Sequence, residues 1–332
     1  MRNHSISLKV GRPSLSITML LCSFLLSSCH DFFEKNIEDD VVTMISPSDG
    51  TSSSIYLQKF FWKPIDGARD FHIQLVTPSF EKIKKIVLDT VVSGTNLTVM
   101  LAPNKYQMSI FATNAGYQSK VTTLSFEIIE SYDLSPQEMN PIFPSNQSAT
   151  NSTSVSFKWD TITGATSYIF ELFDAAGKTV GGAITVPTSS ITIPSSDLKI
   201  SQLTEQAYSW RIFARNEISD SKASISRFTV DRTAPAQPKT IQPKASDTTQ
   251  IAAAQFSWTK MTDIGTPITD SIFIASDQSF TSVVAKAQCN KNTFSYSFPN
   301  TSATYYWKLK QTDAAGNSTE TQTYKLLVIP NN

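Results

Sequence analysis

The chain has 332 residues, enough for two or three domains, and only 17% of them are charged. Aromatic residues make up 11%, a composition that suits strands with polar outer faces and excludes a disordered chain. The first 28 residues hold three basic residues and no acidic one, so the rest carries 25 basic against 28 acidic residues, a net charge of −3. A near-neutral chain lacks the basic footprint of a nucleic-acid partner.

Residues 1–28 have the form of a secretory signal peptide, with a basic start, an apolar run from about Ile17 to Leu26, and small residues. The run is too short to span a bilayer. Leu26-Ser27-Ser28-Cys29 resembles the bacterial lipobox, which implies cleavage before Cys29 and lipidation of its thiol. Several acyl chains, such as palmitate, anchor a protein stably. The alternative is an ordinary signal peptide that ends at a cysteine by chance.

Residues 29–42 follow as an acidic tether, with five acidic residues and one lysine between His30 and Asp40. One interpretation is a solvated leash that reaches on the order of 20 Å. An acidic stretch behind a lipidated cysteine also resembles the export signal of surface lipoproteins in Gram-negative glycan degraders. That resemblance implies an outer-membrane protein on the cell surface, and a position on the inner leaflet is the alternative.

The remaining chain repeats one pattern three times, over residues 43–130, 131–232 and 233–332. A Phe-x-Trp strand recurs with Trp62, Trp159 and Trp258, spaced by 97 and 99 positions. A period near 100 residues is typical of one β-sandwich per repeat. Proline-bearing links join the repeats and stiffen the joints. The sequence therefore predicts three tandem sandwiches.

Each repeat also has a late strand with an aromatic or methionine anchor, followed six residues on by Asn or Asp. These are Asn114 after Met108, Asn216 after Trp210, and Asp313 after Trp307. Short side chains that bond their own backbone suit a turn entry. The third copy departs from the pattern, because Asp270 takes the place of Tyr168.

The Phe-x-Trp, Gly-Ala-x-x-Tyr and Tyr-x-Trp motifs resemble those of fibronectin type III and bacterial immunoglobulin-like domains, over about residues 43–330. The resemblance implies an all-β chain of three tandem immunoglobulin/fibronectin type III-like sandwiches. With the lipobox and the acidic tether, the whole is similar to accessory lipoproteins of outer-membrane glycan-uptake systems. It implies a polysaccharide or an uptake complex as partner, but fold does not give function.

Catalytic chemistry has few residues to use. After the signal peptide only His30 and His72 remain, so we expect no Ser-His-Asp or Cys-His device and no zinc site. A carboxylate pair for glycoside hydrolysis stays open by composition. For the cluster Asp313, Asn317 and Glu320, a solvated turn is favoured over calcium. We expect no enzyme, no catalytic residue, no cofactor and no metal, and a partly buried thiol at Cys289.

All five tryptophans fall on alternating apolar faces, which favours the core over sugar stacking. The better candidates for ligand contact are three aromatics in turns or links: Phe80, Tyr117 and Phe143. The sequence thus predicts a non-enzymatic, lipid-anchored surface protein for binding or spacing, which assists glycan capture at the outer membrane. The alternative is a structural or adhesive rod that engages protein partners.

Overall fold

The computed structural model describes residues 34–244, 247–250, 254–259 and 266–329. Every regular element in this part of the chain is a β-strand, which confirms the predicted all-β class. The leader, Cys29 and Gly265 lie outside it. The chain divides into two compact units, one of residues up to 53, 59–99 and 104–128, the other of residues 54–58, 100–103 and 129 onward.

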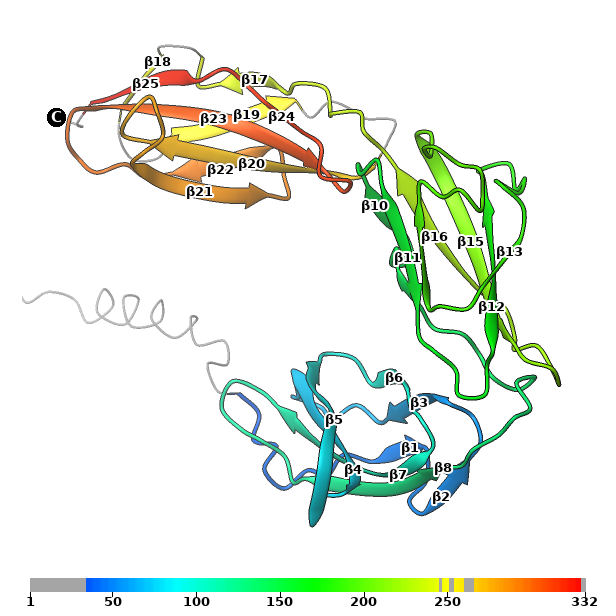
Figure 1. The fold of residues 1–332 in the computed structure, drawn as a ribbon. Helices are drawn as coiled ribbons and strands as arrows, with labels where there is room; N and C mark the ends of the chain where they lie inside the picture. The colour runs from blue at the N-terminus through cyan, green and yellow to red at the C-terminus, as the bar shows by residue number, and fades with distance from the viewer. Residues whose placement is uncertain (1–33, 245–246, 251–253, 260–265, 330–332) are drawn as a thin grey trace, which may run out of the picture. The chain divides into compact units, whose positions relative to one another are not determined.

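The first sandwich packs a three-stranded sheet against a five-stranded one (Figure 1). The small sheet has the order β1 (Met44–Ser46), β3 (Leu57–Trp62), β6 (Asn96–Met100). The large sheet has the order β2 (Thr51–Ser53), β8 (Thr122–Ile128), β7 (Asn104–Thr113), β4 (Asp70–Ser79), β5 (Lys82–Val92). The strand β2 runs parallel to β8, and β1 pairs antiparallel with β3. The pairs β8–β7, β7–β4 and β4–β5 are antiparallel as well.

The second sandwich repeats this order. Its small sheet holds β9 (Pro141–Phe143), β11 (Val155–Trp159) and β14 (Ser190–Ile193). Its large sheet has the order β10 (Ser148–Thr150), β16 (Ser224–Val230), β15 (Gln206–Arg215), β12 (Ser167–Phe173), β13 (Ile184–Val186). The match in order shows that the sequence repeat is a repeat of the fold.

The third sandwich follows the same plan. Its small sheet holds β17 (Lys239–Gln242), β19 (Ala254–Thr259) and β22 (Thr293–Tyr296). Its large sheet has the order β18 (Asp247–Gln250), β25 (Tyr324–Ile329), β23 (Ala303–Asp313), β20 (Ile268–Ala275), β21 (Val283–Cys289). The short strand β24 (Ser318–Glu320) also pairs with β23.

The tryptophans form the cores, as predicted. All five are at most 2% exposed: Trp62, Trp159, Trp210, Trp258 and Trp307. In the second sandwich, Phe157 lies edge-on to Trp210 with ring centroids 5.4 Å apart. Inward residues alternate along β7, β15 and β23 because successive strand residues point to opposite faces. The ring faces are thus buried, which excludes them as exposed sugar platforms.

The third core replaces an aromatic contact by hydrogen bonds. Trp62 packs edge-on against Phe71 in the first sandwich, and Trp159 lies 5.7 Å from Tyr168 in the second. Asp270 occupies this position in the third, which confirms the predicted register. Its buried carboxylate accepts 2.9 Å and 2.8 Å hydrogen bonds from the Trp258 indole and the Gln311 amide. A buried carboxylate is tolerated when such donors satisfy it.

Candidate functional site

One asparagine side chain joins three segments of the first sandwich. The amide nitrogen of Asn114, just after β7, donates hydrogen bonds to the carbonyls of Lys35 (2.8 Å) and Gly67 (3.0 Å). Its amide oxygen accepts bonds from the backbone N–H groups of Gly116 (3.1 Å) and Tyr117 (2.8 Å). The predicted turn entry is confirmed, and the same side chain also holds the incoming chain at Lys35. We call this arrangement the linker clamp.

The second sandwich has the same linker clamp. Asn216 donates to the carbonyls of Tyr132 (2.9 Å) and Gly164 (3.0 Å), and accepts from the N–H groups of Ile218 (2.9 Å) and Ser219 (2.8 Å). Tyr132 belongs to the segment that enters the sandwich. Two residues 84 positions apart are therefore joined by a single side chain.

A glycine with a left-handed backbone conformation receives each of the first two clamps, and at Gly67 it also allows a close approach. Gly67 and Gly164 both have a φ of +85°, in the left-handed region that other residues rarely adopt. A Cβ on Gly67 would lie 2.7 Å from Cβ of Lys35, so a larger residue would displace the incoming chain. The Gly-Ala signal in the sequence thus marks the receiving side of the clamp.

The third sandwich divides the same role between two residues. Asp313 occupies the turn-entry position, and its carboxylate accepts bonds from the N–H group (2.9 Å) and the amide (2.9 Å) of Asn317. The Asn317 amide also donates to the carbonyl of Asp231 (2.8 Å), on the incoming chain. A carboxylate cannot donate to a carbonyl, so Asn317 supplies the donor that Asp313 lacks.

The predicted turn at Asp313, Asn317 and Glu320 is held by hydrogen bonds and an ion pair. The Asp313 carboxylate is bound by Asn317, as in a hydrogen-bonded turn. Glu320 instead pairs with Lys308 at 2.7 Å. No group of three or more His, Cys, Asp or Glu side chains is arranged to hold a metal within the described ranges.

The incoming segments of the first two sandwiches dock in the same way. The N–H group of Asp40 bonds the Ile37 carbonyl at 3.0 Å, and the Asp40 carbonyl accepts from the Lys120 N–H group at 3.0 Å. In the second sandwich, the Gln137 N–H group donates to the Leu134 carbonyl at 2.8 Å, and the Gln137 carbonyl accepts from the Lys222 N–H group at 2.9 Å. Ile37 and Leu134 are both 0% exposed.

The structure therefore differs from the expected leash over residues 34–42. Ile37 and Val42 are buried, and Lys35 pairs with Asp66 at 2.8 Å. Burial of these apolar side chains stabilises the docked segment, and a solvated tether would have no such burial. The signal was present in the sequence, because Ile37 and Val42 are spaced like Leu134 and Met139 in the next link. Cys29, the predicted lipid acceptor, lies outside the described residues.

The link before the second sandwich is also fixed at its polar residues. The buried Gln137 side chain accepts from the Tyr56 N–H group at 2.9 Å and donates to the Ser54 carbonyl at 2.6 Å. The Tyr56 hydroxyl lies 3.0 Å from the carbonyl and 2.8 Å from the nitrogen of Ser131. All of these residues belong to the second unit. These buried polar groups are therefore satisfied within the second unit.

The three predicted ligand-contact aromatics lie at three separate places along the chain, two of them at opposite ends of the first sandwich. Phe80 is half-buried in the turn between β4 and β5, where its N–H group bonds Gln107 at 2.8 Å. Tyr117 is half-buried at the opposite end of β4, beyond the Asp70–Thr113 pair. Phe143 is 45% exposed on β9 of the second sandwich. Phe80 and Tyr117 therefore form no shared platform on the first sandwich, and ligand contact by each of the three residues stays a prediction.

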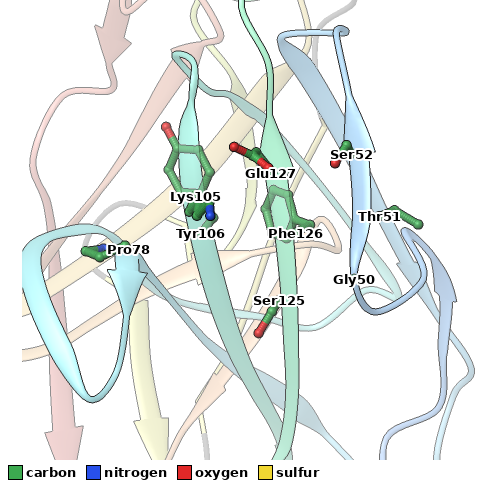
Figure 2. A pocket seen from close by; sticks show the side chains of 9 residues that line it. All are labelled: Gly50, Thr51, Ser52, Pro78, Lys105, Tyr106, Ser125, Phe126 and Glu127. Carbon is green, nitrogen blue, oxygen red and sulfur yellow. The ribbon is translucent and has the colours of Figure 1, made fainter.

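Figure 2 shows a shallow crevice on the first sandwich, where Lys105 and Glu127 flank Tyr106 and Phe126. Its volume is about 240 Å³. Typical small-molecule sites are clefts of about 300–1,000 Å³. The two rings stack on each other with centroids 5.5 Å apart and are buried, so they offer no open face. The crevice therefore lacks the features of a sugar site.

His72 contacts a carboxylate and an aromatic ring. Its Nε2 lies 3.0 Å from Asp89, and its ring lies edge-on to Phe111 at 4.9 Å. Cys289 ends β21 and packs against the third core, and burial raises the pKa of its thiol. That is the opposite of a reactive cysteine, whose pKa is lowered. Within the described residues no helix is long and apolar enough to cross a membrane.

The strand order of all three repeats is that of fibronectin type III-like sandwiches. The solved structures that the chain resembles include two sets of such domains. The FN1–FN3 domains of chicken CNTN1 are 15% identical, with a TM-score of 0.41 over 87% of this chain and 97% of that chain. The CbhA fibronectin(III)-like modules of Clostridium thermocellum are 9% identical, with a TM-score of 0.40 over 58% of this chain and 94% of that one. No family model and no curated protein matches the sequence.

Proposed function

We propose that this chain is a non-enzymatic spacer or adhesive protein that engages protein partners. The observation that carries the proposal is the linker clamp, which recurs at Asn114, Asn216 and Asn317. A flexible leash needs no such bonds, whereas a spacer needs incoming segments that hold their position. Polar side chains form hydrogen bonds at these joints, and aromatic side chains pack in the three cores.

Lipid on Cys29 is the proposed anchor, at the outer membrane and facing the cell exterior. Only four residues, 30–33, lie between Cys29 and Glu34, the first residue that the structure describes. The five Cα–Cα steps from Cys29 to Glu34 span at most about 18 Å in an extended chain. The first sandwich would then lie close to the membrane surface, and its loops and edges would face neighbouring surface proteins.

A protein partner is favoured over a glycan by the kind of side chain that is exposed. Large exposed apolar residues are mostly aliphatic, and three of them lie on one strand of the first sandwich: Ile83, Ile86 and Val91. Sugar sites instead use open aromatic faces. Glycan capture rests on the sequence resemblance alone.

The test is proximity labelling on intact cells that produce the full chain, with Cys29→Ala as the matched control. The proposal expects the protein in the outer-membrane fraction, accessible to external protease, with labelled surface proteins that disappear in the control. A soluble wild-type chain would contradict the anchor. Specific retention by one polysaccharide on a glycan array, with no labelled protein, would contradict the protein partner.

A further inference from the structure

The edge strand β5 of the first sandwich is long and open. It ends the five-stranded sheet, and among the described residues only β4 pairs with it. Its 11 residues rise about 36 Å. The corresponding strand of the second sandwich, β13, has only three residues and is followed by Pro187. Short strands and proline are common protections of a sheet edge, and β5 has neither.

Positive charge is concentrated in one half of β5. Lys82, Lys84 and Lys85 are all exposed, and no ion pair joins any of them to a carboxylate in the described part of the chain. The only acidic residue of the strand, Asp89, is already bound to His72 and Gln74. The corresponding strand β21 of the third sandwich has a single lysine, Lys286, which lies over the Phe273 ring.

Exposed aliphatic residues lie among these lysines and at the far end of the strand. Ile83, Ile86 and Val91 are 49%, 52% and 57% exposed. Lysines and bulges both protect an edge from pairing with other chains, and β5 has two irregularities in its register with β4. Protection alone does not require half-exposed isoleucines among the lysines. A partner that covers them explains both features.

The regular half of the strand is the part suited to backbone pairing. From Leu88 to Val92 the register with β4 is uninterrupted. An edge strand has unpaired N–H and C=O groups on its outer side, to which an extended peptide adds as a further strand. Side chains directly opposite each other then lie about 4.5–5.5 Å apart, so their charges decide which peptide fits.

We propose that β5 binds an acidic extended segment of a partner protein by strand addition. Backbone bonds form along Leu88–Val92, while acidic side chains meet Lys82, Lys84 and Lys85, and apolar side chains of the segment cover the exposed isoleucines. A second copy of this chain fits less well in parallel register, because each lysine would then lie opposite the same lysine of the other copy and the like charges would repel. The inference rests on the protein-partner part of the proposed function and is independent of the lipid anchor.

The test uses the full chain in detergent and a peptide of alternating Glu and Val as the probe, read by fluorescence anisotropy at low salt. Control peptides alternate Lys with Val, or Glu with Gly, which keeps the acid and removes the strand preference. The variant is K82E/K84E/K85E. Its matched control, K158E/K178E/K325E, makes the same charge change on exposed lysines of the other sandwiches.

We expect the Glu-Val peptide to bind the wild type and the matched control, with an affinity at least about tenfold weaker for the β5 variant. Binding should slow hydrogen exchange within residues 88–92. Equal binding by Glu-Gly peptide, protection elsewhere, or no difference between the two variants would overturn the proposal. A concentration-dependent dimer without peptide binding would also overturn it, in favour of a second copy. Cell fractionation of the β5 variant distinguishes loss of peptide binding from loss of the lipid anchor, because a variant that keeps its anchor stays in the outer-membrane fraction.

Discussion

The linker clamp of the second sandwich gives the sharpest stability prediction. The change Asn216→Ala removes four hydrogen bonds, two to Tyr132 and Gly164 and two from Ile218 and Ser219. Each contributes about 0.5–1.5 kcal/mol net, and the side chain is only half-buried, so we expect a loss of about 2–3 kcal/mol. For a domain of this size that lowers the midpoint of thermal unfolding by about 8–20 °C.

Scanning calorimetry is the assay, because a chain of several sandwiches does not unfold in one two-state step. The transition of the second sandwich is assigned by comparison with Asn114→Ala, which changes the first. Asn146→Ala is the matched control in the same sandwich, since Asn146 makes one bond, to the Arg227 N–H group at 3.0 Å. If Asn216→Ala shifts the transition no more than Asn146→Ala, the clamp does not hold the linker and the reasoning is refuted.

Four further predictions follow from the structure. Ile37→Ala should cost the first sandwich about 2–4 kcal/mol, because Ile37 is fully buried, and an effect below about 0.5 kcal/mol in urea unfolding would restore the free leash. Trp159→Ala should cost about 3–5 kcal/mol, again by urea unfolding, and a loss of binding at unchanged stability would instead make Trp159 a ligand contact. Asp270→Ala leaves the buried donors of Trp258 and Gln311 without an acceptor, which should cost about 1–3 kcal/mol of unfolding free energy for each. D270F/Q311A rebuilds the Phe71 and Ala112 arrangement of the first core and should recover part of the lost unfolding temperature in calorimetry. Hydrogen bonds from Ser279, Thr281 and Ser282 hold the pKa of Asp277 well below its usual range, so the ionised carboxylate stabilises the turn above the unfolded pKa of about 3.9, and this stabilisation is lost only as pH falls through the lower folded pKa. The amides of the turn should therefore be as protected from hydrogen exchange at pH 5 as at pH 7, and Asp277→Asn should remove that protection at both pH values.

Much of the fold was predictable because strand alternation is a local signal and because the tryptophans recur at a nearly constant spacing. The pattern of Tyr208, Trp210, Ile212 and Ala214 marks one face of β15, and all four are buried. The change at Asp270 could be located, but not its partners, because hydrogen bonding to Trp258 depends on how two sheets pack. Sequence reasoning found that asparagine follows the late strand. It missed the donor bonds to carbonyls about 80 residues away, because a backbone acceptor carries no residue-type signal.

The docked state of residues 34–42 could have been predicted. Ile37 and Val42 are apolar positions inside an acidic stretch, and their spacing of five residues matches that of Leu134 and Met139. By contrast, the position of Phe80 and Tyr117 at opposite ends of β4 follows only from the strand register. Candidate loop aromatics chosen one by one from a sequence do not need to share a surface.

Hydrogen exchange of the full chain tests the central claim most directly, at the amides of Asp40 and Gln137. Each amide bonds a carbonyl within its own incoming segment, Ile37 at 3.0 Å and Leu134 at 2.8 Å. If the incoming segments are docked, both amides exchange far more slowly than an unstructured chain, and Asn114→Ala and Asn216→Ala each release the one on its own sandwich. Exchange of both amides at the unstructured rate in the wild type would contradict the account, because the linkers would then be free.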